Sequence, residues 1–151
     1  MLTANILVVE DFERFRQFVV STLRQGAKFE VAEASSGLEA LQRIEEREPD
    51  LVLLDIGLPG LNGLEVARRL RKLAIPLKIV FISQESSPEI VREALNLGAL
   101  GYVHKLRASA WVIGTNPKPP PKRSWITGYT RVTWRELMTK DSSKSSIARK
   151  T

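Results

Sequence analysis

Up to about residue 106, hydrophobic residues along the chain form two kinds of pattern. Short uninterrupted apolar runs have the length and branched side chains of buried strands. These runs predict strands at residues 6–9, 29–34, 51–54, 78–82 and 99–103. Between them, apolar residues recur at spacings of three and four, as on the buried face of an amphipathic helix. We expect four such faces: Phe12, Phe15, Val19 and Leu23; Leu38, Leu41 and Ile44; Leu64, Ala67 and Leu70; and Ile90, Ala94 and Leu97.

Residues that commonly begin and end helices lie between these patterns. Helix starts are expected at Ser36, Asn62 and Ser87, and helix ends at Gly26, Pro49, Pro76 and Gly98. Strands and helices therefore alternate along the chain. Continuous apolar strands indicate a parallel sheet that is covered on both faces. The predicted fold class is α/β, a doubly wound five-stranded parallel sheet.

Composition and charge narrow the range of functions. The sequence has no cysteine, which excludes a disulfide framework, a zinc-thiolate site and a cysteine nucleophile. No apolar run is long enough to cross a membrane, and the first residues lack the features of a signal peptide. We expect a soluble, cytoplasmic protein without membrane partners. The net charge of +6 divides into −2 for residues 1–106 and +8 for residues 107–151, so the basicity belongs to the tail.

Five polar residues follow the predicted strands, and parallel strands bring their carboxyl ends to one edge of the sheet, where ligands bind. These residues are Glu10, Asp11, Asp55, Ser83 and Lys105. Three adjacent carboxylates repel one another unless a cation lies between them, and oxygen ligands suit Mg²⁺. Asp55 can then act as a nucleophile toward phosphorus. Taken singly, Asp11 also fits a helix N-cap, Ser83 a turn residue and Lys105 a solvated surface lysine.

The same residues lie in motifs that resemble the CheY-like receiver domain of two-component response regulators. The resemblance covers about residues 3–106. It rests on VVED (8–11), LLDIGLPGLNGLEVARRLR (53–71), FIS (81–83) and GALGYVHK (98–105). The second motif is most similar to the subgroup usually joined to a LuxR/NarL-type helix-turn-helix output domain. The resemblance implies a flavodoxin-like sheet with the strand order 2-1-3-4-5.

The resemblance also implies the chemistry. Asp55 is the expected phosphoacceptor, which takes a phosphoryl group from a histidine kinase, a phosphotransfer protein or a small phosphodonor. Mg²⁺ is the expected cofactor, held by Glu10, Asp11, Asp55 and the backbone carbonyl of Gly57. The protein is not expected to be an enzyme: it is expected to be a signalling receiver that catalyses only its own phosphorylation and dephosphorylation.

Signalling in this family implies a conformational switch. Ser83 and Lys105 are expected to bind the phosphoryl oxygens, and Tyr102 matches the switch aromatic residue. The surface that changes is the face of the fourth helix and fifth strand. We expect it to contact a downstream protein or a second copy of the chain.

After Lys105 the sequence departs from the family pattern. The expected division is a receiver domain at 3–106, a remnant of the last helix at 107–116 and a disordered, basic tail at 117–151. Four of the eight prolines lie at positions 117, 119, 120 and 121, which predicts an extended linker. A fifth helix is therefore expected to be missing or truncated, and a helix-turn-helix output domain to be absent. No sequence-specific DNA binding is predicted.

Three alternatives remain open from the sequence. One is a receiver-like fold whose aberrant C-terminus prevents signalling. Another is a Mg²⁺-dependent phosphatase with an aspartyl-phosphate intermediate, although the residues after Asp55 lack the second aspartate of such enzymes. A third is nonspecific nucleic-acid binding by the basic tail.

Overall fold

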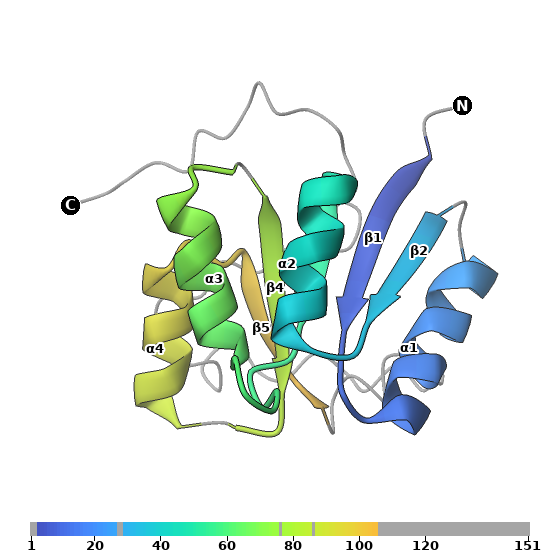
Figure 1. The fold of residues 1–151 in the computed structure, drawn as a ribbon. Coiled ribbons are helices and arrows are strands. Elements are labelled where there is room, and N and C mark those ends of the chain that lie inside the picture. The colour runs from blue at the N-terminus through green and yellow to red at the C-terminus, as the bar shows by residue number, and fades with distance from the viewer. Residues whose placement is uncertain (1–2, 27–28, 76, 86, 106–151) are drawn as a thin grey trace.

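Five strands and four helices alternate along the part of the chain that the structure describes (Figure 1). The structure is a computed structural model and describes residues 3–26, 29–75, 77–85 and 87–105. The strands are β1 (Ala4–Val9), β2 (Phe29–Ala34), β3 (Leu51–Leu54), β4 (Lys78–Ser83) and β5 (Gly101–His104). The helices are α1 (Glu13–Gly26), α2 (Gly37–Glu46), α3 (Gly63–Lys72) and α4 (Pro88–Asn96). The predicted alternation is confirmed, and the last strand begins two residues later than predicted.

The strands form one sheet in the order β2-β1-β3-β4-β5, and each neighbouring pair is parallel. This order confirms the predicted flavodoxin-like topology. It reverses direction at β1, because the chain first builds outward to β2 and then returns to β3 on the other side. All carboxyl ends lie at one edge of the sheet, at the lower end of the view in Figure 1. We call this edge the carboxyl edge.

Two hydrophobic cores lie on opposite faces of the sheet. One core joins Leu7, Val52 and Phe81 to residues of α2, α3 and α4, such as Ile44 and Val66. The other joins the alternate strand positions to α1, through residues such as Ile6, Val8, Leu53, Val19 and Val20. Because successive strand residues point to opposite faces, a continuous apolar strand supplies both cores. The predicted coverage of both faces is thus confirmed.

Helix α2 and helix α3 begin at the predicted caps. The side chain of Ser36 accepts a hydrogen bond from the backbone N–H of Glu39, and the side chain of Asn62 accepts one from Glu65. Such bonds satisfy donors that the first turn of a helix leaves unpaired. Ser87 also precedes a helix, but its side chain makes no capping bond, and Pro88 provides the helical start instead.

Two residues predicted on buried helix faces are exposed. Phe12 is 61% exposed and Leu38 is 65% exposed. Phe12 precedes the first residue of α1, so it never joins the apolar face of that helix. In α2 the buried positions are Gly37, Ala40 and Ile44, a face that leaves Leu38 outside. Both errors concern helix starts, where spacing alone does not fix which residue first faces the sheet.

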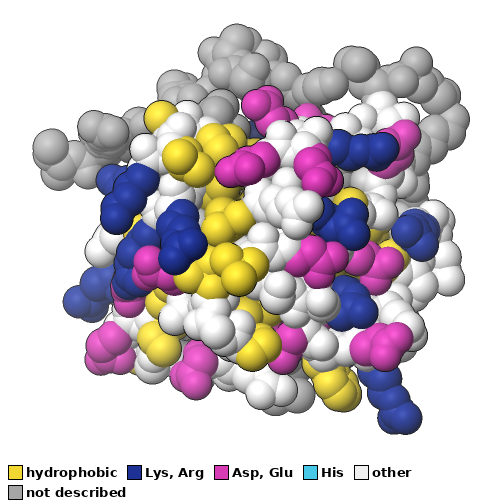
Figure 2. Space-filling model, in the orientation of Figure 1, with side chains coloured by type: hydrophobic (Ala, Val, Ile, Leu, Met, Phe, Trp, Pro, Cys, Tyr) yellow, Lys and Arg dark blue, Asp and Glu magenta, His cyan; other side chains and the backbone are white. Residues whose placement is uncertain are grey.

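The surface of the α2–α3 side carries charges of both signs around exposed apolar patches (Figure 2). Lysine and arginine side chains gather over α3 and α4, and the last turn of α3 contains Arg69, Arg71 and Lys72. Cations at a helix C-terminus interact favourably with the helix dipole. No helix among the described residues is long and apolar enough to span a membrane. The expected helix remnant at 107–116 and the tail at 117–151 lie outside the described residues.

Candidate functional site

Strands β1 and β3 deliver two carboxylates to the carboxyl edge. Glu10 follows β1 directly and Asp55 follows β3 directly. Backbone hydrogen bonds continue past both strand ends, from the N–H of Glu10 to the carbonyl of Ala34 and from the N–H of Asp55 to that of Val9, each 3.0 Å long. The hydrogen bonding of the sheet therefore extends to the backbone of both acids.

The three predicted acids lie together. Glu10, Asp11 and Asp55 can each offer a carboxylate oxygen, with these atoms all within 4.8 Å of one another. Glu10 is 2% exposed and Asp55 is 3% exposed, whereas Asp11 is exposed. The cluster therefore has a buried base and an open side. Among the described residues, no other group of three or more metal-binding side chains comes this close together.

Lys105 reaches the same place from the end of β5. Its Nζ lies 2.8 Å from Oε2 of Glu10 and 3.1 Å from Oδ2 of Asp55. The lysine side chain is 13% exposed, so this ammonium group is largely shielded from water. Its Nζ also lies 5.2 Å from the ring centroid of Phe15 on α1, a cation–π contact. One cation thus bridges two of the three acids.

Burial and charge shift the pKa values of two groups in this site. Burial raises the pKa of Glu10 to about 7, and the charge of Asp55 adds to this, against hydrogen bonds from Lys105 and the Phe12 backbone. Burial alone would lower the pKa of Lys105, but its hydrogen bonds and charge interactions with Glu10 and Asp55 raise it instead. Lys105 therefore stays charged. The repulsion that remains between the carboxylates of Glu10 and Asp55 is relieved when Glu10 takes up a proton or when a cation binds beside it.

The acid cluster fits a hard divalent cation. Mg²⁺ takes oxygen ligands at about 2.1 Å, so its ligands stand at most about 4.2 Å apart. The three carboxylates offer oxygen atoms only, and their spread of up to 4.8 Å needs only a small side-chain adjustment to meet that limit. Asp11 is exposed, so water can enter the cluster from this side and supply the water ligands that Mg²⁺ usually keeps. Glu10, Asp11 and Asp55 could therefore hold this metal.

The loop after Asp55 is held close to the acid. The backbone N–H of Gly57 donates to Oδ1 of Asp55 over 3.1 Å. At Gly63, a side-chain Cβ would lie 2.1 Å from the backbone oxygen of Asp55. Only glycine permits such an approach, so the start of α3 packs directly on the backbone of Asp55 and Ile56. The predicted role of the Gly57 carbonyl toward the metal stays a prediction.

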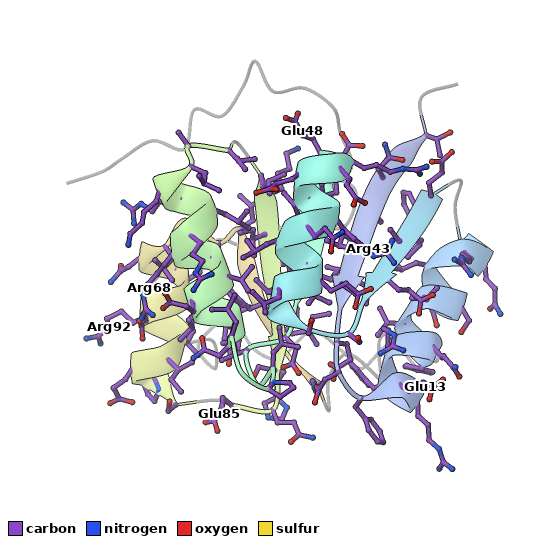
Figure 3. All side chains as sticks on the ribbon, viewed as in Figure 1. Glu13, Arg43, Glu48, Arg68, Glu85 and Arg92 are labelled. Atoms are coloured by element: carbon purple, nitrogen blue, oxygen red, sulfur yellow. The ribbon has the colours of Figure 1, made fainter. Side chains whose placement is uncertain are left out.

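Ser83 and Tyr102 complete the predicted set at this edge. Ser83 is 1% exposed at the end of β4, and its Oγ accepts a 3.1 Å hydrogen bond from the N–H of Glu85. The hydroxyl of Tyr102 on β5 donates to the carbonyl of Glu85 over 2.6 Å. In Figure 3, Glu85 lies at the same end of the molecule as Glu13 at the start of α1, and Glu48 lies at the opposite end.

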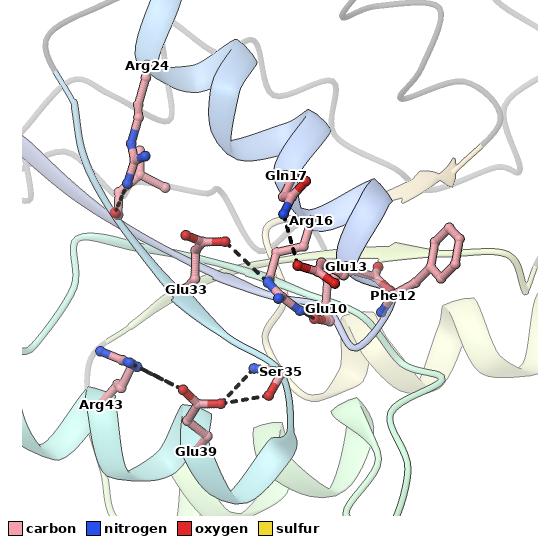
Figure 4. A network of polar contacts seen from close by, with 11 residues as sticks. Glu10, Phe12, Glu13, Arg16, Gln17, Arg24, Glu33, Ser35, Glu39 and Arg43 are labelled. Carbon is pink, nitrogen blue, oxygen red and sulfur yellow. Dashed lines mark hydrogen bonds and ion pairs between the residues drawn. The ribbon is translucent and has the colours of Figure 1, made fainter.

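Two residues that support the acids were not predicted from the sequence. Arg16 on α1 donates to the backbone carbonyl of Glu10 over 2.9 Å and to Glu33 on β2 over 3.2 Å (Figure 4). Phe15, the neighbour of Arg16, contacts Lys105. Both residues lie on the helix that follows the acidic pair, and the spacing of Phe15 marked it only as a core residue. A polar residue next to an apolar helix position carries no recognisable signal by itself.

The comparison with protein families agrees with this geometry. Residues 6–110 match the family model described as the response regulator receiver domain. The chain is similar to the transcriptional activator protein ExaE of Pseudomonas putida, with 41% identity over 110 residues that cover 72% of this chain and 51% of the relative. It is also similar to the transcription regulator BvgA of Bordetella pertussis, with 34% identity over 145 residues.

The BvgA alignment covers 93% of this chain and 66% of that relative, so it extends past residue 106 into the tail. The chain thus spans about half to two thirds of the length of these curated relatives. Among solved structures, the fold is similar to the signal receiver domain of NarL from Mycobacterium tuberculosis, with a TM-score of 0.69 and 32% identity. That match covers 76% of this chain and 94% of that domain.

Proposed function

Because the chain belongs to the response regulator receiver domain family, we propose that Asp55 accepts a phosphoryl group and thereby acts as the switch of a two-component pathway. The donor is a histidine kinase or a phosphotransfer protein, and the reaction depends on Mg²⁺. The observation that carries this proposal is the convergence of three carboxylates and one buried ammonium group at the carboxyl edge. A soluble, cytoplasmic location follows from such a partner.

The proposed step is an in-line displacement at phosphorus. A carboxylate oxygen of Asp55 attacks the phosphorus atom, and the bond from phosphorus to the imidazole nitrogen of the donor breaks. The electron pair of that bond stays with the imidazole, which leaves as the neutral group after it takes up a proton. The strand end fixes Asp55, and the N–H of Gly57 orients its Oδ1.

Charge neutralisation is the main task of the surrounding residues. The transferred group carries negative charge on its peripheral oxygens, and preorganised cations stabilise that charge best where water is excluded. Lys105 contacts Oδ2 of Asp55 and can follow the phosphoryl oxygens when they arrive. The Ser83 hydroxyl can donate to another of these oxygens. Mg²⁺, held by Glu10, Asp11 and Asp55, supplies further positive charge when bound.

Phosphorylation then alters the surface of α4 and β5. The new group adds about −1.5 to −2 charge and strong hydrogen-bond acceptors at the carboxyl edge. Ser83 moves toward it and draws the Glu85 backbone along, because the Glu85 N–H donates to Ser83, and this movement changes the hydrogen bond between the Glu85 carbonyl and Tyr102. We infer that the altered surface binds a downstream protein or a second copy of the chain. The relatives are named as transcriptional regulators, and we infer that this contact is the route by which the chain affects transcription.

A phosphorylation assay tests the proposal. The protein is incubated with acetyl phosphate and Mg²⁺, and intact mass spectrometry measures the gain of one phosphoryl group. Asp55→Asn and added EDTA should each abolish this gain. The matched control is Asp50→Asn at the other end of β3, where Asp50 accepts a hydrogen bond from the Asn5 backbone. Equal phosphorylation of wild type and Asp55→Asn would overturn the proposal.

A further inference from the structure

The loop between β4 and α4 is held by two side chains of β5. The carbonyl of Glu85 accepts from the Tyr102 hydroxyl over 2.6 Å, and the carbonyl of Gln84 lies 2.9 Å from Nε2 of His104. Residues 102 and 104 point to the same face of the sheet because strand side chains alternate. The two consecutive carbonyls are therefore held from one side by two neighbouring residues of the same strand.

The His104 contact has a defined direction. A carbonyl oxygen can only accept a hydrogen bond, so the proton of this contact must lie on Nε2 of the imidazole. The backbone supports the arrangement, because Ser83 and His104 are register partners in the parallel ladder between β4 and β5. His104 therefore stands beside Ser83 on the neighbouring strand, and its ring reaches the residue that follows Ser83.

The same loop is attached to the switch hydroxyl. The N–H of Glu85 donates to Oγ of Ser83 over 3.1 Å. Residues 84 and 85 are thus restrained by one hydrogen bond to Ser83 and by two hydrogen bonds to side chains of β5. Movement of Ser83 toward Asp55 draws the Glu85 backbone with it, and that movement lengthens the bonds that hold the two carbonyls.

We propose that His104 is a positioning residue that holds this loop, and through it Ser83, in the unphosphorylated arrangement. This inference rests on the proposed function of Asp55. It assigns to the His104 hydrogen bond, in addition to that of Tyr102, the role of restraining the loop. A contact that exists only in the unphosphorylated state has to be broken when the phosphoryl group is accommodated. The free energy of that contact is therefore subtracted from the free energy of binding the phosphoryl group. His104 therefore sets how readily the receiver becomes activated.

Beryllofluoride, a mimic of the phosphoryl group, tests the proposal on the full chain. His104→Leu removes the donor, and His104→Gln retains an N–H that can reach the Gln84 carbonyl. A partly exposed hydrogen bond contributes little net free energy, so His104→Leu should bind beryllofluoride with Mg²⁺ about two- to fivefold more tightly. His104→Gln should restore the wild-type affinity. A merely structural role predicts a lower melting temperature for His104→Leu with unchanged affinity, and that result would overturn the proposal.

A second measurement needs neither metal nor beryllofluoride. Hydrogen exchange at the Glu85 amide reports directly on its bond to Ser83, and His104→Leu should speed this exchange several-fold while His104→Gln leaves it unchanged. Equal exchange rates in wild type and His104→Leu would show that His104 does not restrain the loop, which would contradict the proposal. If the wild-type protein does not bind beryllofluoride, the proposed function of Asp55 fails, and the exchange rates alone decide whether His104 holds the loop.

Discussion

At the scale of single residues, the site depends on how a buried carboxylate is compensated. A buried charge is costly unless hydrogen bonds or an opposite charge accompany it. Asp55 has both, from the N–H of Gly57 and from Nζ of Lys105, each at 3.1 Å. These groups fix the position of Asp55, but Glu10 and Asp11 keep the cluster net negative. An anionic phosphoryl group therefore needs the charge of Lys105 together with that of a bound Mg²⁺ to be stabilised beside the nucleophile.

Phe15 should matter for the rate of phosphorylation through its contact with Lys105. A shielded cation–π contact contributes about 1–2 kcal/mol, and Phe15→Leu removes it while keeping an apolar side chain. We expect acetyl phosphate to modify Asp55 up to about five- to thirtyfold more slowly in this variant. The matched control is Phe18→Leu, which changes the ring packed against Phe15 but not the contact with Lys105. Equal slowing in both variants would show a general packing effect.

Gly63→Ala should loosen the attachment of the loop that follows Asp55. The added Cβ would lie 2.1 Å from the Asp55 oxygen and 2.9 Å from the Ile56 Cα, so the backbone must move. Overpacking against backbone costs about 1–3 kcal/mol of unfolding free energy, measurable by urea denaturation. Gly57→Ala is the control, since its Cβ comes no closer than 3.9 Å to its neighbours. A loss at Gly57 as large as that at Gly63 would contradict this explanation.

At the scale of elements, the hydrophobic pattern predicted the strands better than the helix faces. β3 was predicted with its observed bounds, because a run of four apolar residues between charged and turn residues leaves no other register. The predicted face of α3 was correct, whereas Leu38 in α2 is exposed. A helix face depends on where the helix begins, and tertiary packing decides that start within a residue or two.

The candidate site shows the same division. The acids and Lys105 were predicted because they follow strands, and the parallel sheet brings strand ends together. Phe15 and Arg16 were not predicted as part of the site, because both lie on α1 and reach it through side-chain direction. Sequence spacing gives the face of a helix but not the atoms that a long side chain contacts. The contact of His104 with the next loop is of this second kind as well.

The start of α2 should show a measurable dependence on pH. Glu39 accepts hydrogen bonds from the backbone and hydroxyl of Ser35 and pairs with Arg43 (Figure 4). The bond from the Ser35 backbone is the largest cause that lowers the pKa of Glu39, and burial opposes it. A lowered pKa means stability that is present above the unfolded value of 4.5 and is lost as the pH falls below it.

Glu39→Gln should therefore cost about 0.5–1 kcal/mol of unfolding free energy at pH 7, a small value because Glu39 is partly exposed. The difference from wild type should narrow as the pH falls below 4.5. Urea denaturation across this range measures it, with Glu45→Gln, an exposed residue on the same helix, as the control. A difference that is independent of pH would contradict a role for the charged carboxylate.

At the scale of the whole molecule, the described residues form a complete sheet with its reactive edge at one end and α4 and β5 beside it. The loop of residues 83–85 connects the two, because Ser83 ends β4 in the core and Glu85 bonds to Tyr102 on β5. Charge at the edge and the shape of the α4–β5 face are therefore linked by hydrogen bonds within a few residues. The chain spans about half the length of relatives such as ExaE.

The position of the phosphoryl group distinguishes Asp55 from the other acids of the protein as the phosphoacceptor. The protein is treated with acetyl phosphate and Mg²⁺, and borohydride then reduces the acyl phosphate to a stable homoserine that peptide mass spectrometry can locate. We expect reduction at Asp55 alone, with none when Mg²⁺ is withheld. Homoserine at Asp11 or at any other acid, or none at Asp55 in the phosphorylated protein, would contradict it.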